Sequence, residues 1–212
     1  MKRLIPTVFM AGAVASALIV SSAMAESTQG WKVRVDRSTS ASDPDGAGAV
    51  KFTAEPKGFH AVNPQAAVYW NPANTASGNY TIKGTFILLE PSNHTNYYGI
   101  VFGGKNLDGA DQTYDYFTVA QDGTWLLKRR EGGNARTIVA KTPASAVKTP
   151  GADGKSVNNL EVRVAADKVD FVVNGTVVHS EQKSALGDTN GIWGARVNHF
   201  MNVEIDGLSA SK

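Results

Sequence analysis

The sequence predicts an all-β fold, an antiparallel β-sandwich of the jelly-roll type, and three observations lead to this prediction. Apolar residues alternate over 160–164 and again over 169–173, which is the period of strands that each bury one face. Asn174-Gly175 follows directly and favours a two-residue hairpin, because both central residues of a type I′ turn need positive φ. No helical period of useful length occurs, so the remaining segments are interpreted as strands.

Short strands separated by turn residues account for the rest of the chain. Asn71-Pro72 is predicted to end one strand, and Asp122-Gly123 is predicted to join two others as a hairpin. The segment 142–156 is polar, contains two prolines and is predicted to be a long loop. Besides those of the central hairpin, the predicted strands are 31–35, 49–54, 58–62, 66–70, 80–90, 97–103, 114–120, 125–130, 137–141, 191–197 and 202–208.

Two strands in the middle of the chain divide their residues between an inner and an outer face. In the first, alternation places Tyr98 and Phe102 in the core and leaves Tyr97 and two glycines on the opposite side. Glycines on that side leave room for something to approach the backbone. The next strand turns Tyr114 and Tyr116 away from the core.

The first 25 residues have the organisation of a secretory signal peptide. Two basic residues precede an apolar run, and Ala23-Met24-Ala25 supplies a small-x-small cleavage site. We expect cleavage after Ala25, which leaves 26–212 as a single jelly-roll domain without a membrane span. Because the signal is of bacterial style, the predicted location is periplasmic or secreted.

The predicted mature chain carries no net charge. The signal segment holds two of the 21 basic residues and none of the 19 acidic ones, so 19 basic groups face 19 acidic groups. A neutral chain with scattered charges gives no electrostatic support for nucleic acid or an anionic membrane as a partner. The chain also has no cysteine, which excludes thiol catalysis, thiolate metal sites and lipoprotein anchoring.

Four segments carry a resemblance to a known superfamily: YDYFTVAQDGTWLLKRR (114–130), NNLEVRVAADKVDFVVNGTVV (158–178), GIWGARVNHF (191–200) and VEIDGL (203–208). Their order resembles the concanavalin A-like lectin/glucanase superfamily, and within it laminin G-like domains and the 3-keto-disaccharide hydrolase-like domains of exported bacterial proteins. The resemblance covers residues 31–208 and rests on structural motifs, a hairpin with Asn-Gly and a closing strand with Asp-Gly. It therefore implies a jelly roll and specifies the chemistry poorly.

The catalytic signature of that superfamily is incomplete in this chain. Its retaining glucanases carry Glu-x-Asp-x-Glu on one strand, where alternation brings three acids to one face. The nearest match here is Glu204-Ile205-Asp206-Gly207-Leu208, in which leucine replaces the third acid. We interpret it as the solvated edge of the last strand. Asp111 and Asp115 form the other close pair, but sequence does not define their separation, so no catalytic residue is assigned.

The sequence assigns no metal site and no cofactor. Its four histidines lie far apart without a His-x-x-x-His spacing, which argues against a preformed zinc site. Calcium remains an alternative, since laminin G-like and legume lectin-like members hold it with loop oxygens. Such oxygens could come from Asn106, Asp108 and Asp111, or from Asp43 and Asp45, although solvated turns explain both stretches equally.

Glycan binding on the concave sheet is the more specific hypothesis. Sugars stack their C–H faces on aromatic rings and need bidentate partners for their hydroxyls, so a site combines Tyr or Trp with Arg, Asn or Asp. Trp70 and Trp193 are expected in the core, and His199 is open to a ligand contact or a structural role. The candidate ligand-binding residues are Tyr97, Tyr114, Tyr116, Arg129, Arg196 and Asn198.

These observations predict an exported, noncatalytic carbohydrate-binding (lectin-like) or adhesion module, whose partner is a glycan or another extracytoplasmic ligand. The alternative is an enzyme, a hydrolase of glycosides or 3-keto-disaccharides, as the resemblance implies. A third hypothesis is a structural envelope protein without a small ligand. A convergent acid pair beside a pocket would favour the enzyme, and uniformly polar outer faces without a groove would favour the structural protein. The oligomeric state stays open.

Overall fold

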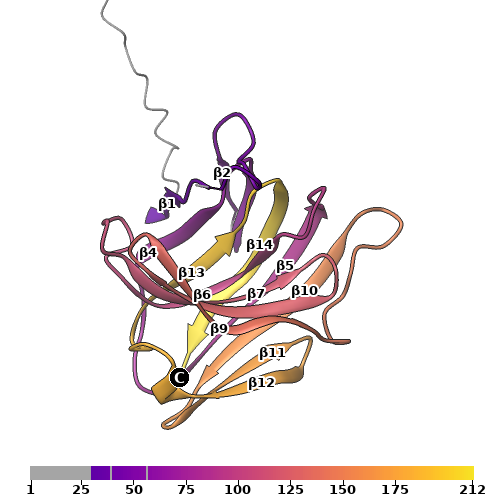
Figure 1. The fold of residues 1–212 in the computed structure, drawn as a ribbon. Helices are drawn as coiled ribbons and strands as arrows, with labels where there is room; N and C mark the ends of the chain where they lie inside the picture. The colour runs from indigo at the N-terminus through magenta and orange to yellow at the C-terminus, as the bar shows by residue number, and fades with distance from the viewer. Residues whose placement is uncertain (1–29, 39, 56) are drawn as a thin grey trace, which may run out of the picture.

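The computed structural model describes residues 30–38, 40–55 and 57–212, which form two facing seven-stranded antiparallel sheets (Figure 1). The predicted signal peptide and its cleavage site lie outside the described residues. No helix in the described part of the chain is long and apolar enough to cross a membrane. The elements are β1 (Lys32–Val35), β2 (Lys51–Glu55), β3 (Gly58–Asn63), β4 (Ala67–Ala76), β5 (Tyr80–Glu90), β6 (Tyr97–Lys105), β7 (Thr113–Ala120), β8 (Thr124–Glu131), β9 (Asn134–Pro143), β10 (Ser156–Val164), β11 (Lys168–Val173), β12 (Thr176–Gln182), the 3-10 turn η2 (Lys183–Ala185), β13 (Gly191–Val197) and β14 (Met201–Ser211).

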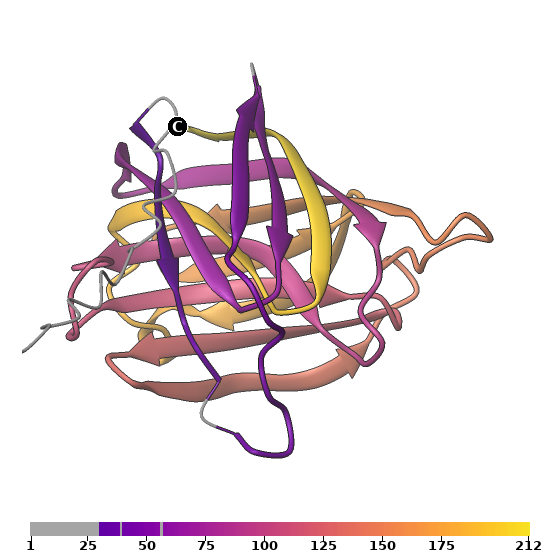
Figure 2. The same ribbon diagram turned by 90° about the horizontal axis from the view of Figure 1, so that it is seen from above.

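The core lies between the two sheets. Sheet A has the strand order β1-β4-β13-β6-β7-β8-β9, and sheet B has the order β12-β11-β10-β5-β14-β3-β2. Phe86 of sheet B packs on Tyr98 of sheet A with 6.3 Å between ring centroids, and Phe171 packs on Phe117 at 5.1 Å. The predicted fold class, an antiparallel β-sandwich, is confirmed. Figure 2 shows the long loop between β1 and β2 projecting from the side opposite the β2–β3 turn.

The predicted central hairpins are present with the expected turn. Strands β10 and β11 pair antiparallel from Leu160–Val173 to Val164–Val169, and β11 then pairs with β12. Asn174 and Gly175 have φ of 50° and 81°, which is the left-handed conformation that this two-residue turn requires. The sequence signal works here because the turn depends only on the two residues that form it.

The prediction that Asn71-Pro72 ends a strand is wrong. Strand β4 continues through Pro72 to Ala76. Beyond Trp70, β4 no longer pairs with β1, and its pairing with β13 shifts register between Ile192 and Gly194. Proline fits at such an irregularity because the backbone N–H that it lacks is not needed for a regular ladder.

The predicted division of β6 and β7 into two faces is confirmed. Tyr98 and Phe102 belong to the core between the sheets. On the outer face of sheet A, the side that faces away from sheet B, a second apolar cluster contains Val68, Trp70, Val101, Leu107, Tyr114, Tyr116 and Leu126. The room beside Gly99 is taken by the neighbouring strand, because a Cβ at this position would lie 2.3 Å from the Phe117 carbonyl oxygen.

Candidate functional site

A buried charged cluster lies on the outer face of sheet A. Asp36 follows the end of β1, Tyr114 is on β7 and Arg196 is on β13. The Arg196 Nη1 donates to Asp36 Oδ2 at 2.6 Å and to the Tyr114 hydroxyl at 2.9 Å, and that hydroxyl donates to Asp36 Oδ2 at 3.1 Å. The three groups therefore hold one another in a closed triangle of hydrogen bonds.

Two more arginines surround the same carboxylate. Arg34 Nε lies 3.4 Å and Arg130 Nη2 lies 4.0 Å from Asp36 Oδ1. The guanidinium carbon of Arg196 lies 5.2 Å from the centroid of the Tyr116 ring, within range of a cation–π contact. One aspartate thus balances part of the charge of three arginines on this face.

Opposing effects act on the ionisation of this cluster. Burial alone would raise the pKa of Asp36, but the charge and hydrogen bond of Arg196 outweigh it, so the pKa lies below its usual value. Burial would lower the pKa of Arg196, yet its hydroxyl and carboxylate neighbours hold that pKa above its ordinary value. Burial raises the pKa of Tyr114. The cluster is therefore a charged Asp–Arg pair with a neutral tyrosine.

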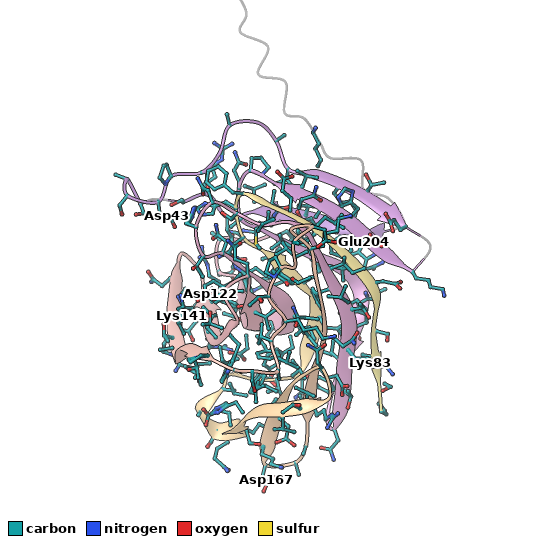
Figure 3. The ribbon with its side chains drawn as sticks, turned by 90° about the vertical axis from the view of Figure 1, so that its right-hand side faces the viewer. Asp43, Lys83, Asp122, Lys141, Asp167 and Glu204 are labelled. Carbon is teal, nitrogen blue, oxygen red and sulfur yellow. The ribbon has the colours of Figure 1, made fainter. Side chains whose placement is uncertain are left out.

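A cavity of about 370 Å³ opens beside this cluster. The loop between β1 and β2, which carries Asp43 in Figure 3, forms one wall, and the turn from β13 to β14 forms another. Its lining consists mostly of polar side chains that can donate or accept hydrogen bonds. The lining residues are Asp36, Arg37, Ser38, Asp43, Asp45, Ala66, Arg130, Gly133, Arg196, Asn198 and His199.

Five of the six predicted ligand-binding residues lie on or beside this face. Arg196 and Asn198 line the cavity. Tyr114 is fully buried and Tyr116 is 7% exposed, so their rings form the floor of the outer face and are not open stacking platforms. The Asn198 N–H donates to the Tyr97 carbonyl oxygen at 2.9 Å, which places Tyr97 next to the cavity wall.

The structure separates Arg129 from the other predicted site residues. Its Nη1 donates to Asp115 Oδ2 at 3.1 Å, on the side of sheet A that faces sheet B. The guanidinium lies against Gly187, where a Cβ would be 1.6 Å from Nη1. The arginine that reaches the cavity is its neighbour Arg130. Because Leu127 is buried, strand alternation turns Arg129 toward the inside and Arg130 toward the outer face. This pattern in the sequence distinguishes the two arginines.

The Asp115 carboxyl is sealed inside the sandwich. It is fully buried, and its Oδ1 has no hydrogen-bond partner among the residues described. Burial raises the pKa of Asp115 to about 6, although Arg129 acts to lower it. This carboxyl does not reach the cavity, so its shifted pKa reflects interior packing.

The other acids considered for catalysis do not converge on the cavity. Glu204 and Asp206 are on β14, which lies between β5 and β3 of sheet B, where Asp206 is exposed and Glu204 is half-buried. Figure 3 shows Glu204 and Asp43 far apart on the molecule. Asp111 Oδ2 accepts a hydrogen bond from Asn106 at 2.8 Å in the loop before β7.

The candidate calcium ligands fall into two unlike environments. In the loop before β7, the Asp108 carboxylate pairs with Lys32 at 3.0 Å, and Asp111 is engaged by Asn106. In the β1–β2 loop, Asp43 and Asp45 face His199 at 3.2 Å each.

Two of the four histidines, which are far apart in the sequence and were therefore not expected to form a metal site, are in contact in the structure. His94 and His199 lie 105 positions apart in the chain, yet their Nε2 atoms are 3.1 Å apart. Asp43 Oδ1 lies 3.0 Å from the first and 3.2 Å from the second. No spacing rule could have detected this, because three separate loops bring the residues together.

Comparison with known proteins defines the class of fold. No protein-family model and no curated protein sequence matches the chain. Among solved structures, the carbohydrate-binding module CBM66 from Bacillus subtilis has a TM-score of 0.59 at 10% identity, covering 86% of this chain and 96% of its own. A Bacillus subtilis protein of unknown function with a galectin-like fold has a TM-score of 0.57 at 14% identity, covering 85% and 88%.

A third structure is a Parabacteroides distasonis protein provisionally assigned as a glycosyl hydrolase. Its TM-score is 0.52 at 12% identity, and the match covers 76% of this chain and 89% of its own. The chain therefore has a galectin-like β-sandwich fold of the kind found in CBM66. At these identities the likeness defines the fold and not the ligand.

Proposed function

We propose that this protein is a noncatalytic carbohydrate-binding module whose ligand occupies the cavity on the outer face of sheet A. The observation that carries the proposal is the set of donors and acceptors that converge there beside buried tyrosines. Arg130, Arg196 and Asn198 offer donors, and Asp43 and Asp45 offer acceptors. A sugar presents several hydroxyls that each donate and accept, so a mixed lining of this kind suits it.

The charge of the lining favours a neutral, hydroxyl-rich ligand. Three aspartates and three arginines line the cavity, so their formal charges cancel. The Asp36–Arg196–Tyr114 triangle fixes the guanidinium before any ligand arrives, which reduces the entropy lost on binding. The fold of CBM66 and the galectin-like proteins supports the proposal as an analogy.

The proposal includes the compartment and the absence of turnover. The organisation of residues 1–25 supports export to the periplasm or beyond, where glycans are accessible. None of the acids singled out for catalysis reaches the cavity, since Asp115 is fully buried and Glu204 and Asp206 lie on sheet B. The aspartates that do line it are paired with basic side chains, Asp36 with Arg196 and Asp45 with His199, which argues against their acting as the two free acids that a glycosidase places on either side of one bond.

The test is a binding screen of the purified protein against neutral and charged glycans, with product analysis of every hit. In the variant Arg130→Ala we expect binding to weaken about 10- to 150-fold, because a charged hydrogen bond contributes about 1.5–3 kcal/mol. The matched control is Arg163→Ala, since Arg163 is an exposed strand arginine on the other sheet that pairs with Glu161. It should bind like the unaltered protein.

The outcomes separate the hypotheses. Binding without products that weakens only in Arg130→Ala supports the module. Released products would establish the hydrolase instead. A ligand that binds both variants equally would place the site elsewhere, and no binding to any glycan would favour a protein partner or a structural role.

A further inference from the structure

Three loops bring two imidazoles and a carboxylate to one point at the rim of the cavity. His94 comes from the β5–β6 loop, His199 from the β13–β14 turn and Asp43 from the β1–β2 loop. The two Nε2 atoms and Asp43 Oδ1 form a triangle with sides of 3.0, 3.1 and 3.2 Å. We propose that this triangle binds a divalent transition-metal ion, with zinc the best match.

The size of the triangle fits that ion. Zinc binds imidazole nitrogen and carboxylate oxygen at about 2.0–2.2 Å, so neighbouring ligand atoms of a tetrahedral site are roughly 3.3 Å apart. The sides of the triangle are shorter than this by a few tenths of an ångström at most. Two imidazoles also favour zinc over calcium, which prefers six or more oxygens.

The remaining ring nitrogens are arranged as metal-binding histidines require. His199 Nδ1 lies 3.2 Å from Asp45 Oδ1, and His94 Nδ1 lies 2.6 Å from Asn93 Oδ1. Each Nδ1–H can donate to its oxygen, which leaves Nε2 with a lone pair that can bind an ion. A carboxylate behind a metal-binding imidazole fixes the tautomer and the ring orientation.

Aromatic packing holds the two rings in place. The Phe200 ring lies 4.9 Å from the His199 ring and 5.8 Å from the His94 ring, centroid to centroid. Phe200 has a φ of 55°, a conformation that costs an aromatic residue free energy and that tends to occur at functional sites. Gly46 leaves space for this ring, because a Cβ there would lie 2.7 Å from it.

Protein groups already contact the same nitrogens. The Asn96 side-chain nitrogen lies 3.1 Å from His94 Nε2 and can donate to it. The two ring nitrogens of His199 lie beside Asp43 and Asp45. The experiment therefore compares variants inside the triangle with variants outside it.

The metal site adjoins the proposed glycan cavity, because Asp43 and His199 line both. Three protein ligands leave a tetrahedral ion one open position for water or for a ligand oxygen. If the proposed function holds, bound zinc should therefore alter glycan affinity. Zinc binding itself is measured without any glycan, so the two proposals can fail separately.

The experiment is calorimetric titration of tag-free, chelator-treated protein with Zn²⁺, followed by Ca²⁺ competition. We expect one zinc ion per chain that excess Ca²⁺ does not displace, and a higher Tm with zinc. His199→Ala and Asp43→Ala should each weaken zinc binding more than about 100-fold. Loss of a residue that only orients a metal ligand weakens binding by at most about 100-fold, so a larger effect identifies a direct ligand. Asp43 is 53% exposed on a loop, so its variant should remain folded.

The controls define what would overturn the site. His60→Ala should bind zinc like the unaltered protein, because His60 bonds to Asn202 on sheet B. Asp45→Asn should weaken zinc binding about 10- to 100-fold through the orientation of His199. Equal zinc binding by the His60→Ala and Asp43→Ala variants would overturn the proposal, and so would a complete absence of zinc binding. Hydrogen bonds would then account for the contacts at this rim.

Discussion

Strand β7 carries two consecutive residues, Tyr114 and Asp115, that join two different buried ion pairs on opposite faces of sheet A. On the outer face, Tyr114 completes the Asp36–Arg196 pair beside the cavity. On the inner face, Asp115 pairs with Arg129 between the sheets. The two pairs contain the same chemical groups, yet their surroundings differ.

The difference lies in how completely each carboxylate is satisfied. Asp36 has the Tyr114 hydroxyl and three arginines around it, and its pKa lies below the ordinary value. Asp115 has one oxygen without a partner among the described residues, and its pKa is raised to about 6. The many donors around Asp36 keep its carboxylate charged, whereas the shortage of donors at Asp115 costs stability.

The largest expected effect comes from Asp36→Ala. In the described part of the chain, Asp36 is the sole ion-pair partner of Arg34, Arg130 and Arg196, so its loss leaves the largely buried Arg196 guanidinium without an anion. Removing one partner of a buried pair costs about 3–5 kcal/mol, and urea unfolding should show a loss of this size.

The matched variant for this prediction is Asp115→Ala. Arg129 keeps a second partner there, since its Nε donates to Glu131 at 2.8 Å. The free energy of unfolding should therefore fall less than in Asp36→Ala. A larger loss in Asp115→Ala would show that the inner pair is the better satisfied of the two, and an equal loss would show that the two pairs do not differ.

The second prediction uses the pH dependence of stability. Because the pKa of Asp115 is raised to about 6 from 3.8, the folded state binds the proton more tightly than the unfolded state does. Its contribution to stability is therefore most favourable near pH 4 and declines as pH rises to about 6. The pKa of Asp36 is lowered, so its contribution persists over this window and is lost only at lower pH.

The measurement is the unfolding free energy of wild type and Asp115→Asn at pH 4.5 and pH 7. The variant has no titrating group at this position, so relative to it the wild type should lose about 2 kcal/mol of stability between these values. A difference that stays constant with pH would mean that Asp115 remains charged throughout.

The same contrast shows what sequence could and could not predict of the fold. Strand alternation and the Asn174-Gly175 turn are encoded by residues adjacent in the chain, so the hairpins and both faces of β6 and β7 were predictable. The strand end predicted at Pro72 is absent because the tolerance of this proline depends on the irregular pairing of β4 with β13, which no local pattern encodes.

The site was predictable only where it follows alternation. The faces of Tyr114 and Tyr116 follow directly, and alternation from Leu127 would have selected Arg130 in place of Arg129. Asp36 had no such signal, because its bond to Arg196 spans 160 positions in the chain. Long-range partners of this kind depend on the sheet order, which the sequence alone did not provide.

The smallest expected effect distinguishes the two tyrosines of the outer face. The Tyr114 hydroxyl bonds to both Asp36 and Arg196, whereas the Tyr116 hydroxyl has no hydrogen-bond partner among the residues described. Tyr114→Phe should therefore lower the free energy of unfolding by about 1 kcal/mol, and Tyr116→Phe should change it by less than about 0.5 kcal/mol. Urea unfolding of the pair measures this directly. Because both rings stay in place, any difference comes from the hydroxyl alone, and equal losses would mean that the triangle around Asp36 adds nothing to the fold.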